Sequence, residues 1–285
     1  MARARAQCGT VAVSIFVNPL QFGDPEDIAH YPRTLELDLA VCAKAGVDVV
    51  FVPSVAEMYP GWPVPVATTV SVREVSEGWE GASRPGHFDG VATVVAKLFS
   101  IAGPCRAYFG EKDYQQLAVV RQMVADLSLP VTVTGCPIVR EPDGLALSSR
   151  NVRLSPAERR AAVVLSRALA AGRSLLEQGV DYSSTVSEAM RRAVEGEPLV
   201  HLDYAVAVGA HDLVAREVIA DPAAVRLLIA AEVGPVRLID NCAGAVVAQA
   251  TPGATGLSRG RVGTSADAGS ARAESAEDRQ LERIG

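Results

Sequence analysis

The feature that most constrains the fold is a repeated order of short apolar strands and amphipathic helices in the first half of the chain. Residues 10–17 form a nearly continuous β-branched run that ends at Asn18 and Pro19, which is typical of a strand buried on both faces. Apolar residues at helical spacing then continue to Gly46, and a second apolar run covers residues 47–52. This is a strand, helix, strand unit.

The same order repeats up to residue 134. It comprises a helix over residues 91–101, a strand over residues 105–109, a helix from Leu117 to Leu127 and a strand over residues 131–134. Strands that alternate with helices form βαβ units with right-handed crossovers. The pattern therefore predicts an α/β fold, a doubly wound parallel sheet whose ligand binds at the carboxyl ends of the strands.

The pattern changes near residue 153, where a second domain is predicted to begin. Ser155 and Glu158 form a capping box with Pro156 at the first helical position, and they open a long helix rich in Ala and Leu. The alternation from Val200 to Val208 is typical of a strand with one buried face. The remaining predicted elements are a helix around residues 186–194 and strands over residues 225–231 and 236–239.

The last part of the chain has a different composition. From Thr251 onward it is rich in Gly, Ala, Ser and charge and has only four large aliphatic side chains, too few to offset the entropy lost on ordering. We therefore divide the chain into a first domain of residues 1–152, a small α+β domain of residues 153–245 and a disordered tail of residues 246–285.

Composition excludes several classes of protein. The 27 Lys and Arg against 33 Asp and Glu give a net charge of −6, which argues against nucleic acid or an anionic membrane as a partner. The five cysteines never fall in a C-x-x-C or metal-ligand spacing. No apolar run reaches the ~18 residues of a membrane span, and the start lacks the apolar core of a signal peptide. These observations predict a cytoplasmic protein with reduced thiols.

The segment richest in chemical groups is F-G-E-K-D-Y-Q-Q, residues 109–116, at a predicted junction of strand and helix. Gly110 permits close approach of the backbone, the helix amino terminus offers unpaired N–H groups, and Lys112 adds a mobile cation. Together these groups suit a polyphosphate. The alternative is a surface turn capped by Asp113.

A second polar segment, residues 139–151, leads from a Pro-Asp-Gly turn into Ser148, Ser149 and Arg150. Hydroxyls and a guanidinium can hold phosphoryl oxygens while negative charge moves onto a leaving pyrophosphate. A solvated linker between domains is the alternative.

Two further loops contain groups that could complete a site. Residues 16–23 follow the first strand, and Gln21 there can hydrogen-bond a hydroxyl or carboxylate. Residues 84–90 precede a helix, and their Arg and His could face a carboxylate. Taken alone, the first segment is better explained as an ordinary polar turn, and the second as a helix-entry loop that needs no ligand. The sequence has no P-loop, no G-x-G-x-x-G after a strand and no G-x-S-x-G, so the residues alone predict only an anion-binding α/β enzyme.

In their order along the chain, these segments resemble the pantothenate synthetase (pantoate–β-alanine ligase) family. The similar stretches are S-I-F-V-N-P-L-Q-F-G, Y-P-R-T, R-P-G-H-F-D-G-V, Y-F-G-E-K-D-Y-Q-Q and D-G-L-A-L-S-S-R-N, and the resemblance covers residues 3–245. It implies a Rossmann-like amino-terminal domain, a smaller carboxyl-terminal lid and a cytosolic homodimer. It also implies condensation of pantoate with β-alanine through a pantoyl adenylate, with ATP as a substrate, release of pyrophosphate and AMP, and a requirement for Mg²⁺.

The resemblance also implies roles for individual residues. The residues that would bind ATP are Gly110, Glu111, Lys112, Asp113, Val139, Leu147, Ser148, Ser149 and Arg150. Lys112 would contact the phosphates, and Arg150 would support catalysis from the loop that stands where related nucleotidyl transferases have K-M-S-K-S. Pantoate would be bound by Gln21 and Gln116, with Asn18 and His87 as further candidates for the substrate pocket. No metal ligands are assigned.

One stretch of the family pattern is absent. The family begins with a strand and P-T-M-G-x-L-H-x-G-H, whose histidines grip the ATP phosphates and include the proton donor, and residues 1–285 contain no such stretch. Met1 to Ala6 resemble the end of the helix that follows it. We therefore expect Met1 to be an internal start, with the first strand of the sheet and the histidine motif encoded upstream.

The absent histidines leave a second hypothesis open, namely a catalytically impaired remnant or nucleotide-binding module. A dinucleotide-dependent oxidoreductase is a weaker third hypothesis, because the glycine-rich fingerprint is absent. Pantoate-dependent exchange of pyrophosphate into ATP distinguishes the first two.

Overall fold

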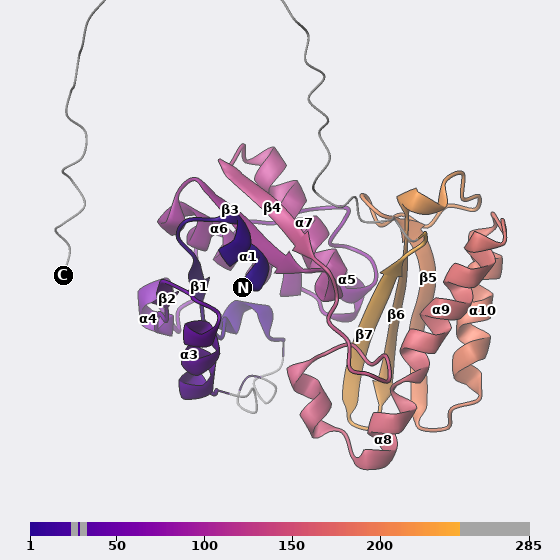
Figure 1. Ribbon diagram of the computed structural model, residues 1–285. Helices are drawn as coiled ribbons and strands as arrows, with labels where there is room; N and C mark the ends of the chain where they lie inside the picture. Colours follow the sequence, from indigo (N-terminus) through magenta and orange to yellow (C-terminus); the bar gives the residue numbers. More distant parts are fainter. Residues whose placement is uncertain (24–27, 29–32, 246–285) are drawn as a thin grey trace, which may run out of the picture. The chain divides into compact units, whose positions relative to one another are not determined.

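The computed structural model describes residues 1–23, residue 28 and residues 33–245 (Figure 1). Met1–Val247 form one compact unit. The predicted tail at residues 246–285 lies outside the described residues, as do Tyr31 and Pro32 of the Y-P-R-T stretch.

The first half contains short parallel strands arranged as two pairs. β1 (Ala12–Ser14) pairs with β2 (Val49–Phe51), and β3 (Cys105–Gly110) pairs with β4 (Val131–Cys136). The α/β class and the parallel pairing are as predicted, although β1 is much shorter than the apolar run that predicted it. Among the described strands none joins the two pairs into one sheet, so each pair keeps unpaired edges.

Two long helices pack with the β3–β4 pair and form the core of the first half. They are α6 (His87–Ala102) and α7 (Tyr114–Asp126), and their apolar faces meet at Val91, Val119 and Met123, each at most 2% exposed. Burying each such side chain contributes about 1.5–3 kcal/mol. The shorter helices of this half are α1 (Ala2–Gln7), η1 (Pro19–Gln21), α3 (Leu35–Lys44), α4 (Val55–Met58), α5 (Glu80–Ser83) and η2 (Glu111–Asp113).

The apolar residues that recur at helical spacing before Gly46 are Leu35, Leu39 and Cys42 of α3, and they do not form one buried face. Cys42 is buried, but Leu35 and Leu39 are 43% and 40% exposed. The neighbouring β1–β2 pair has strands of only three residues, and these strands expose side chains of their own, so the pair is too small to cover the helix.

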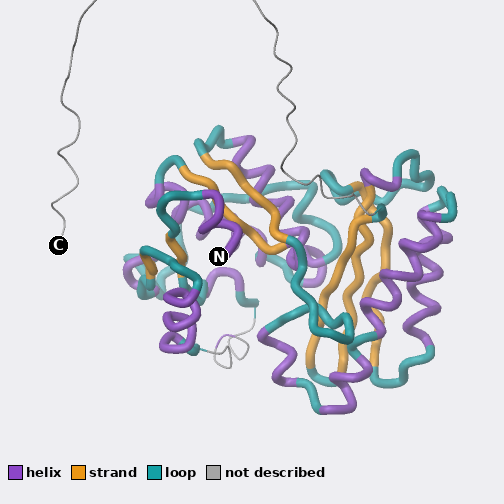
Figure 2. Tube along the Cα trace, viewed as in Figure 1, coloured by secondary structure: helices purple, strands orange, loops and turns teal. Residues whose placement is uncertain are grey.

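The second half is an antiparallel sheet with helices along one face (Figure 2). Its strands, in spatial order, are β5 (Val200–Gly209), β6 (Val225–Val233) and β7 (Val236–Ala243). Its helices are α8 (Pro156–Ala161), α9 (Val164–Glu177) and α10 (Ser183–Glu195), and two short 3₁₀ turns are η3 (Ser149–Arg153) and η4 (Pro222–Ala224).

The predicted capping box is present, but the single long helix is not. The Ser155 hydroxyl accepts from the Glu158 N–H, and the Glu158 carboxylate accepts from the Ser155 N–H. Ala162 and Val163 then separate α8 from α9, with ψ angles of −24° and −20° that are close to 3₁₀ values. The helical sequence pattern continues through this tightened turn, which is why it predicts one helix.

The sequence predicts one buried face for strand β5, and the strand buries both along its second half. Ala205 and Ala207 pack in the core with α9 and α10, whereas Val206 and Val208 pack with Tyr114 of α7. The second face is therefore covered by a helix from the first half of the chain, which the local alternation cannot reveal.

The five cysteines are free; Cys42 is buried and the other four are partly buried. Among the described residues, no helix combines the length and the apolar composition needed to cross a membrane.

Gly90 of α6 leaves no room for a side chain, and this predicts a large effect of a small substitution. A Cβ at Gly90 would lie 2.2 Å from the Leu20 carbonyl oxygen and 2.7 Å from the Gln21 nitrogen, which are backbone atoms. Because backbone cannot swing aside, we expect Gly90→Ala to lower the free energy of unfolding by about 1–3 kcal/mol or more in urea denaturation.

The matched control is Gly196→Ala at the end of α10. Gly196 has a φ of −80°, and a methyl group at this position would have nothing within 4 Å, so the stability is expected to change by less than about 0.5 kcal/mol. Equal stabilities for the two variants would contradict the close contact between α6 and η1 at Gly90.

Candidate functional site

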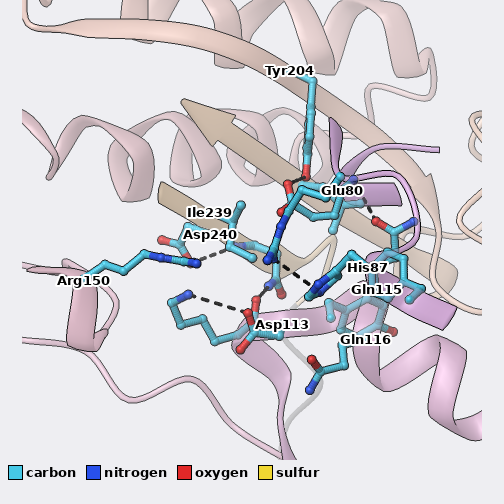
Figure 3. A pocket seen from close by; sticks show the side chains of 15 residues that line it. Glu80, His87, Asp113, Gln115, Gln116, Arg150, Tyr204, Ile239 and Asp240 are labelled. Atoms are coloured by element: carbon cyan, nitrogen blue, oxygen red, sulfur yellow. Dashed lines mark hydrogen bonds and ion pairs between the residues drawn. The ribbon is translucent and has the colours of Figure 1, made fainter. Parts of the chain in front are cut away.

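A pocket lies where the amino-terminal end of α7 meets the β5–β7 sheet (Figure 3). Lys112 and Asp113 of η2, the turn that follows β3, form part of its wall, so the pocket is at the carboxyl end of a parallel strand, as predicted. Side chains fill most of the space, and the cavity volume is about 40 Å³. Pockets for small ligands measure about 300–1,000 Å³, so a nucleotide can enter only if side chains or strands of the wall move apart.

Members of three separate polar segments of the sequence meet in this pocket. The predicted site residues that line it are His87, Lys112, Asp113, Gln116 and Arg150. Figure 3 shows His87, Asp113, Gln116 and Arg150 around the same space, although they come from α6, η2, α7 and η3. The structure therefore brings together groups that lie up to 63 residues apart in the chain, here His87 and Arg150.

Other predicted residues lie outside the lining of the pocket. Val139 and Leu147 are 66% and 51% exposed. The Ser148 hydroxyl accepts a 3.2 Å hydrogen bond from the Arg150 N–H and so caps η3, the turn that also contains Ser149. Gly110 ends β3 and Glu111 begins η2, next to Lys112 and Asp113, but neither residue lines the pocket.

The amino terminus of α7 is arranged to receive an anion. The Asp113 side chain makes no capping hydrogen bond to the helix, so the simple capped turn considered as the alternative is not what forms. The first N–H groups of a helix lack intrahelical partners and carry partial positive charge. The Lys112 ammonium adds a positive charge at this helix end, which the Asp113 carboxylate 3.9 Å away partly offsets.

His87 holds the turn that contains Gln21. The Gln21 carbonyl oxygen accepts a 2.8 Å hydrogen bond from His87 Nδ1 and a 3.3 Å hydrogen bond from the Arg84 guanidinium. His87 Nε2 lies 3.3 Å from the same guanidinium, which requires the neutral imidazole as acceptor. Burial lowers the pKa of His87 below its usual value of 6.5, and the positive charge of Arg84 acts in the same direction.

Asn18 is a structural residue in this arrangement, because it is only 2% exposed and lies outside the lining of the pocket. Its side-chain carbonyl accepts a 2.8 Å hydrogen bond from the Tyr59 hydroxyl. Its amide donates to the Gly90 carbonyl at 3.0 Å and to the Gln21 side chain at 3.3 Å. Asn18 therefore joins η1 to α6 and orients Gln21 behind His87.

Several residues of the pocket were not identified from the sequence. They are Glu80, Gln115, Tyr204, Asp240 and Asn241, among others. Glu80 accepts hydrogen bonds from the Tyr204 hydroxyl at 3.0 Å and from the Arg237 guanidinium at 2.8 Å. Burial and the neighbouring Glu80 carboxylate raise the pKa of Tyr204.

Two of these residues, Glu80 and Gln115, lie near or within stretches that the sequence marks. Glu80 lies four residues before the R-P-G-H-F-D-G stretch, whereas Tyr204 and Asp240 lie in apolar strands with nothing local to mark them. Gln115 was part of the predicted polar segment, and its side chain turns away to bind the Glu80 N–H and the Val75 and Gly78 carbonyls.

Within residues 1–23, 28 and 33–245, no group of three or more His, Cys, Asp or Glu side chains is placed to hold a metal ion.

The family model for pantoate–β-alanine ligase matches residues 1–243. The chain belongs to the pantoate–β-alanine ligase family. This membership confirms the resemblance drawn from the sequence motifs.

Individual members of the family are similar over most of their length. Pantothenate synthetase of Heliobacterium modesticaldum is 53% identical over 242 residues, which cover 85% of this chain and 84% of the relative. The crystal structure of pantothenate synthetase from Thermus thermophilus is 50% identical, covers 85% of this chain and 86% of its own, and has a TM-score of 0.80. The enzyme from Francisella tularensis, in a crystal structure complexed with β,γ-ATP and β-alanine, is 33% identical with a TM-score of 0.66, covering 85% of this chain and 82% of its own.

The depressed pKa of His87 predicts that this residue makes stability depend on pH. The unfolded chain binds a proton at His87 more readily than the folded chain, so stability is fully present above about pH 6.5 and falls as the pH is lowered through the folded pKa. We expect His87→Asn, which can still donate to the Gln21 carbonyl, to reduce this fall, measured as the free energy of urea unfolding between about pH 7 and pH 5.

The exposed His201→Asn is the control and should keep the pH dependence of the unchanged protein. If His87→Asn and His201→Asn give the same slope, the buried neutral imidazole does not contribute to it.

Proposed function

We propose that this protein condenses pantoate with β-alanine through a pantoyl adenylate. In the first step the pantoate carboxylate attacks the α-phosphorus of ATP and pyrophosphate leaves. In the second, the β-alanine amine attacks the acyl carbon, AMP leaves and the amine loses a proton. The observation that carries this proposal is the family match over residues 1–243, joined to a pocket in which Lys112, Gln116 and Arg150 converge.

The electrostatics of the pocket suit the adenylation step. Negative charge moves onto pyrophosphate as its bond to the α-phosphorus breaks, and fixed positive groups stabilise that shift better than water does. Lys112 and the amino terminus of α7 supply such groups, and Arg150 adds a guanidinium from η3. In this proposal ATP is bound by the turn of Gly110–Asp113 and by residues 139 and 147–150.

Pantoate is proposed to bind beside Gln116 and Gln21. Gln116 lines the pocket. Gln21 lies next to His87, and the His87 Nδ1 donates a 2.8 Å hydrogen bond to the backbone carbonyl of Gln21. Amide side chains can both donate to the carboxylate and accept from the hydroxyls of such a substrate.

Mg²⁺ belongs to this proposal, with Asp113 as the residue that would hold it. Mg²⁺ is usually bound by one or two carboxylates together with substrate phosphates, and the Asp113 side chain is 53% exposed beside Lys112. The Glu80 and Asp240 carboxylates suit it less, because each is already paired with an arginine. When bound, Mg²⁺ neutralises charge on the polyphosphate.

The proposed organisation has residues 1–152 as the nucleotide- and pantoate-binding domain and residues 153–245 as a lid over it. The free cysteines agree with a reducing compartment, and we propose the cytoplasm.

The protein is further proposed to form a homodimer. Leu37 and Val41, four residues apart on α3, are 66% and 53% exposed, and Val49 of β2 is 52% exposed. Such apolar groups on one element and its neighbour favour association with a second copy.

Loss of the Lys112 ammonium tests the ATP site. We expect Lys112→Ala to lower pantoate-dependent exchange of pyrophosphate into ATP by about 100-fold or more, because removing one preorganised group at a developing charge costs about 10²–10³ in rate. Lys44→Ala, at an exposed lysine near the end of α3, is the control and should retain the rate of the unchanged chain.

The unchanged chain decides the proposed function itself in the same assay. Absence of any pantoate-dependent exchange would favour the nucleotide-binding module considered as the alternative. Exchange that survives Lys112→Ala would instead remove this lysine from the mechanism.

The homodimer is tested by light scattering after gel filtration. Leu37→Glu places a charge on the exposed face of α3 and should give a monomer, whereas Ile101→Glu, at a residue of α6 that is 60% exposed, should leave the mass unchanged. A monomeric mass for the unchanged chain would contradict the proposed association.

A further inference from the structure

We propose that Asn241 of β7 and Arg226 of β6 are positioning residues that fix the turn of Glu111–Asp113 in the conformation that receives ATP. This inference rests on the proposed function, because it concerns the turn assigned to the phosphates. It adds two residues of the carboxyl-terminal sheet, Arg226 and Asn241, and neither residue belongs to any of the sequence motifs.

The Asn241 side chain is committed entirely to this turn and to Arg226. It is 2% exposed, and its Nδ2 donates to the Glu111 carbonyl at 2.9 Å and to the Lys112 carbonyl at 2.8 Å. Its Oδ1 accepts from Arg226 Nε at 2.7 Å. Both amide hydrogens and the amide oxygen therefore have partners, which fixes the orientation of the amide group.

These bonds set the direction of two consecutive peptide groups. In a trans peptide the C=O points opposite to the N–H of the following residue. Because the Glu111 and Lys112 carbonyls point toward Asn241, the N–H groups of Lys112 and Asp113 point away from β7. Asn241 thus determines where the donors at the start of α7 are directed, and it does so through backbone atoms that no substitution in the turn removes.

Arg226 braces the same turn from a second direction. Its Nη2 lies 3.2 Å from the Glu111 carboxylate, and its guanidinium lies 4.1 Å above the ring of Tyr114, the first residue of α7. The Arg226 side chain is only 9% exposed and that of Glu111 is 28% exposed, so both contacts are at least partly shielded from water, where charged and cation–π interactions are stronger than on an open surface.

Other contacts attach the two halves without touching this turn. Arg237 binds Glu80, and Arg140 binds Asp240 through two hydrogen bonds of 2.6 and 2.9 Å. Simple attachment of the sheet therefore does not require that Asn241 bind the Glu111 and Lys112 carbonyls. The residue is placed for the conformation of the turn.

Two substitutions of Asn241 separate its bonds from its volume and its charge. Asn241→Leu keeps a similar side-chain volume and removes every hydrogen bond of the Asn241 side chain. Asn241→Asp keeps an acceptor for Arg226 but has no donor for the two carbonyls. The control is Leu238→Val on the same strand, at a core residue that is 5% exposed and packs in the cluster behind the sheet.

Hydrogen exchange of the full chain, read on peptides that cover residues 110–118, tests the position of the turn without depending on activity. We expect both Asn241 variants to speed exchange in this segment by about 10-fold, because each takes the Asn241 hydrogen bonds from the partly buried Glu111 and Lys112 carbonyls. In steady-state assays, KM for ATP should rise by about 10-fold while KM for pantoate changes less than about 2-fold. Leu238→Val should neither speed exchange selectively in residues 110–118 nor raise KM for ATP more than KM for pantoate.

The proposal is overturned if Asn241→Asp behaves like the unchanged chain, or if either Asn241 variant raises both KM values equally, as Leu238→Val would if it loosened the whole fold. If the unchanged chain neither binds ATP nor exchanges pyrophosphate, the proposed function fails. Hydrogen exchange in residues 110–118 then decides alone whether Asn241 holds the turn.

Discussion

The rest of the structure depends on the burial of the β5–β7 sheet on both faces. One face packs on α9 and α10, and the other meets α7, so polar groups at this second contact are removed from water. Buried polar groups need partners, and here the partners come from the opposite half of the chain. Glu80 meets Arg237, and Asn241 meets the Glu111 carbonyl. Removing one member takes a partner from a group that is largely out of contact with water, and a buried polar group left without a partner costs about 1–3 kcal/mol, so these contacts together hold the two halves.

The same contact forms the wall of the pocket, and this links stability to binding. The cavity of about 40 Å³ is small because side chains from both halves meet across it. A ligand the size of ATP must separate some of these groups and replace their interactions with its own. The energy of opening the contact is therefore part of the binding energy, and variants that weaken the contact should affect binding even where they do not touch the ligand.

How much of the fold and of the pocket could be predicted from the sequence depends on how far apart the interacting residues lie along the chain. The helices α6 and α7 and the capping box at Ser155 follow from local periodicity and spacing, and they are present. The second buried face of β5 could not be predicted, because the helix that covers it lies far away in the sequence. Asn241 was missed for the same reason: it contacts Lys112 across 129 residues and sits in an apolar strand that carries no motif.

Charge in the pocket shows how these distant contacts prepare a site for an anion in a chain whose net charge is −6. Three carboxylates line the pocket, at Glu80, Asp113 and Asp240, and three cations line it, at Arg84, Lys112 and Arg150. Counted alone, these groups cancel. Glu80 and Asp240, however, are bound by Arg237 and Arg140, which do not line the pocket. Arg140 offsets the charge of Asp240, and Arg237 is shared between Glu80 and Asp203, so the two buried carboxylates of the pocket are bound by arginines of the contact. A polyphosphate in this pocket would therefore not meet the Glu80 and Asp240 carboxylates without their arginines, and these arginines belong to the contact between the two halves.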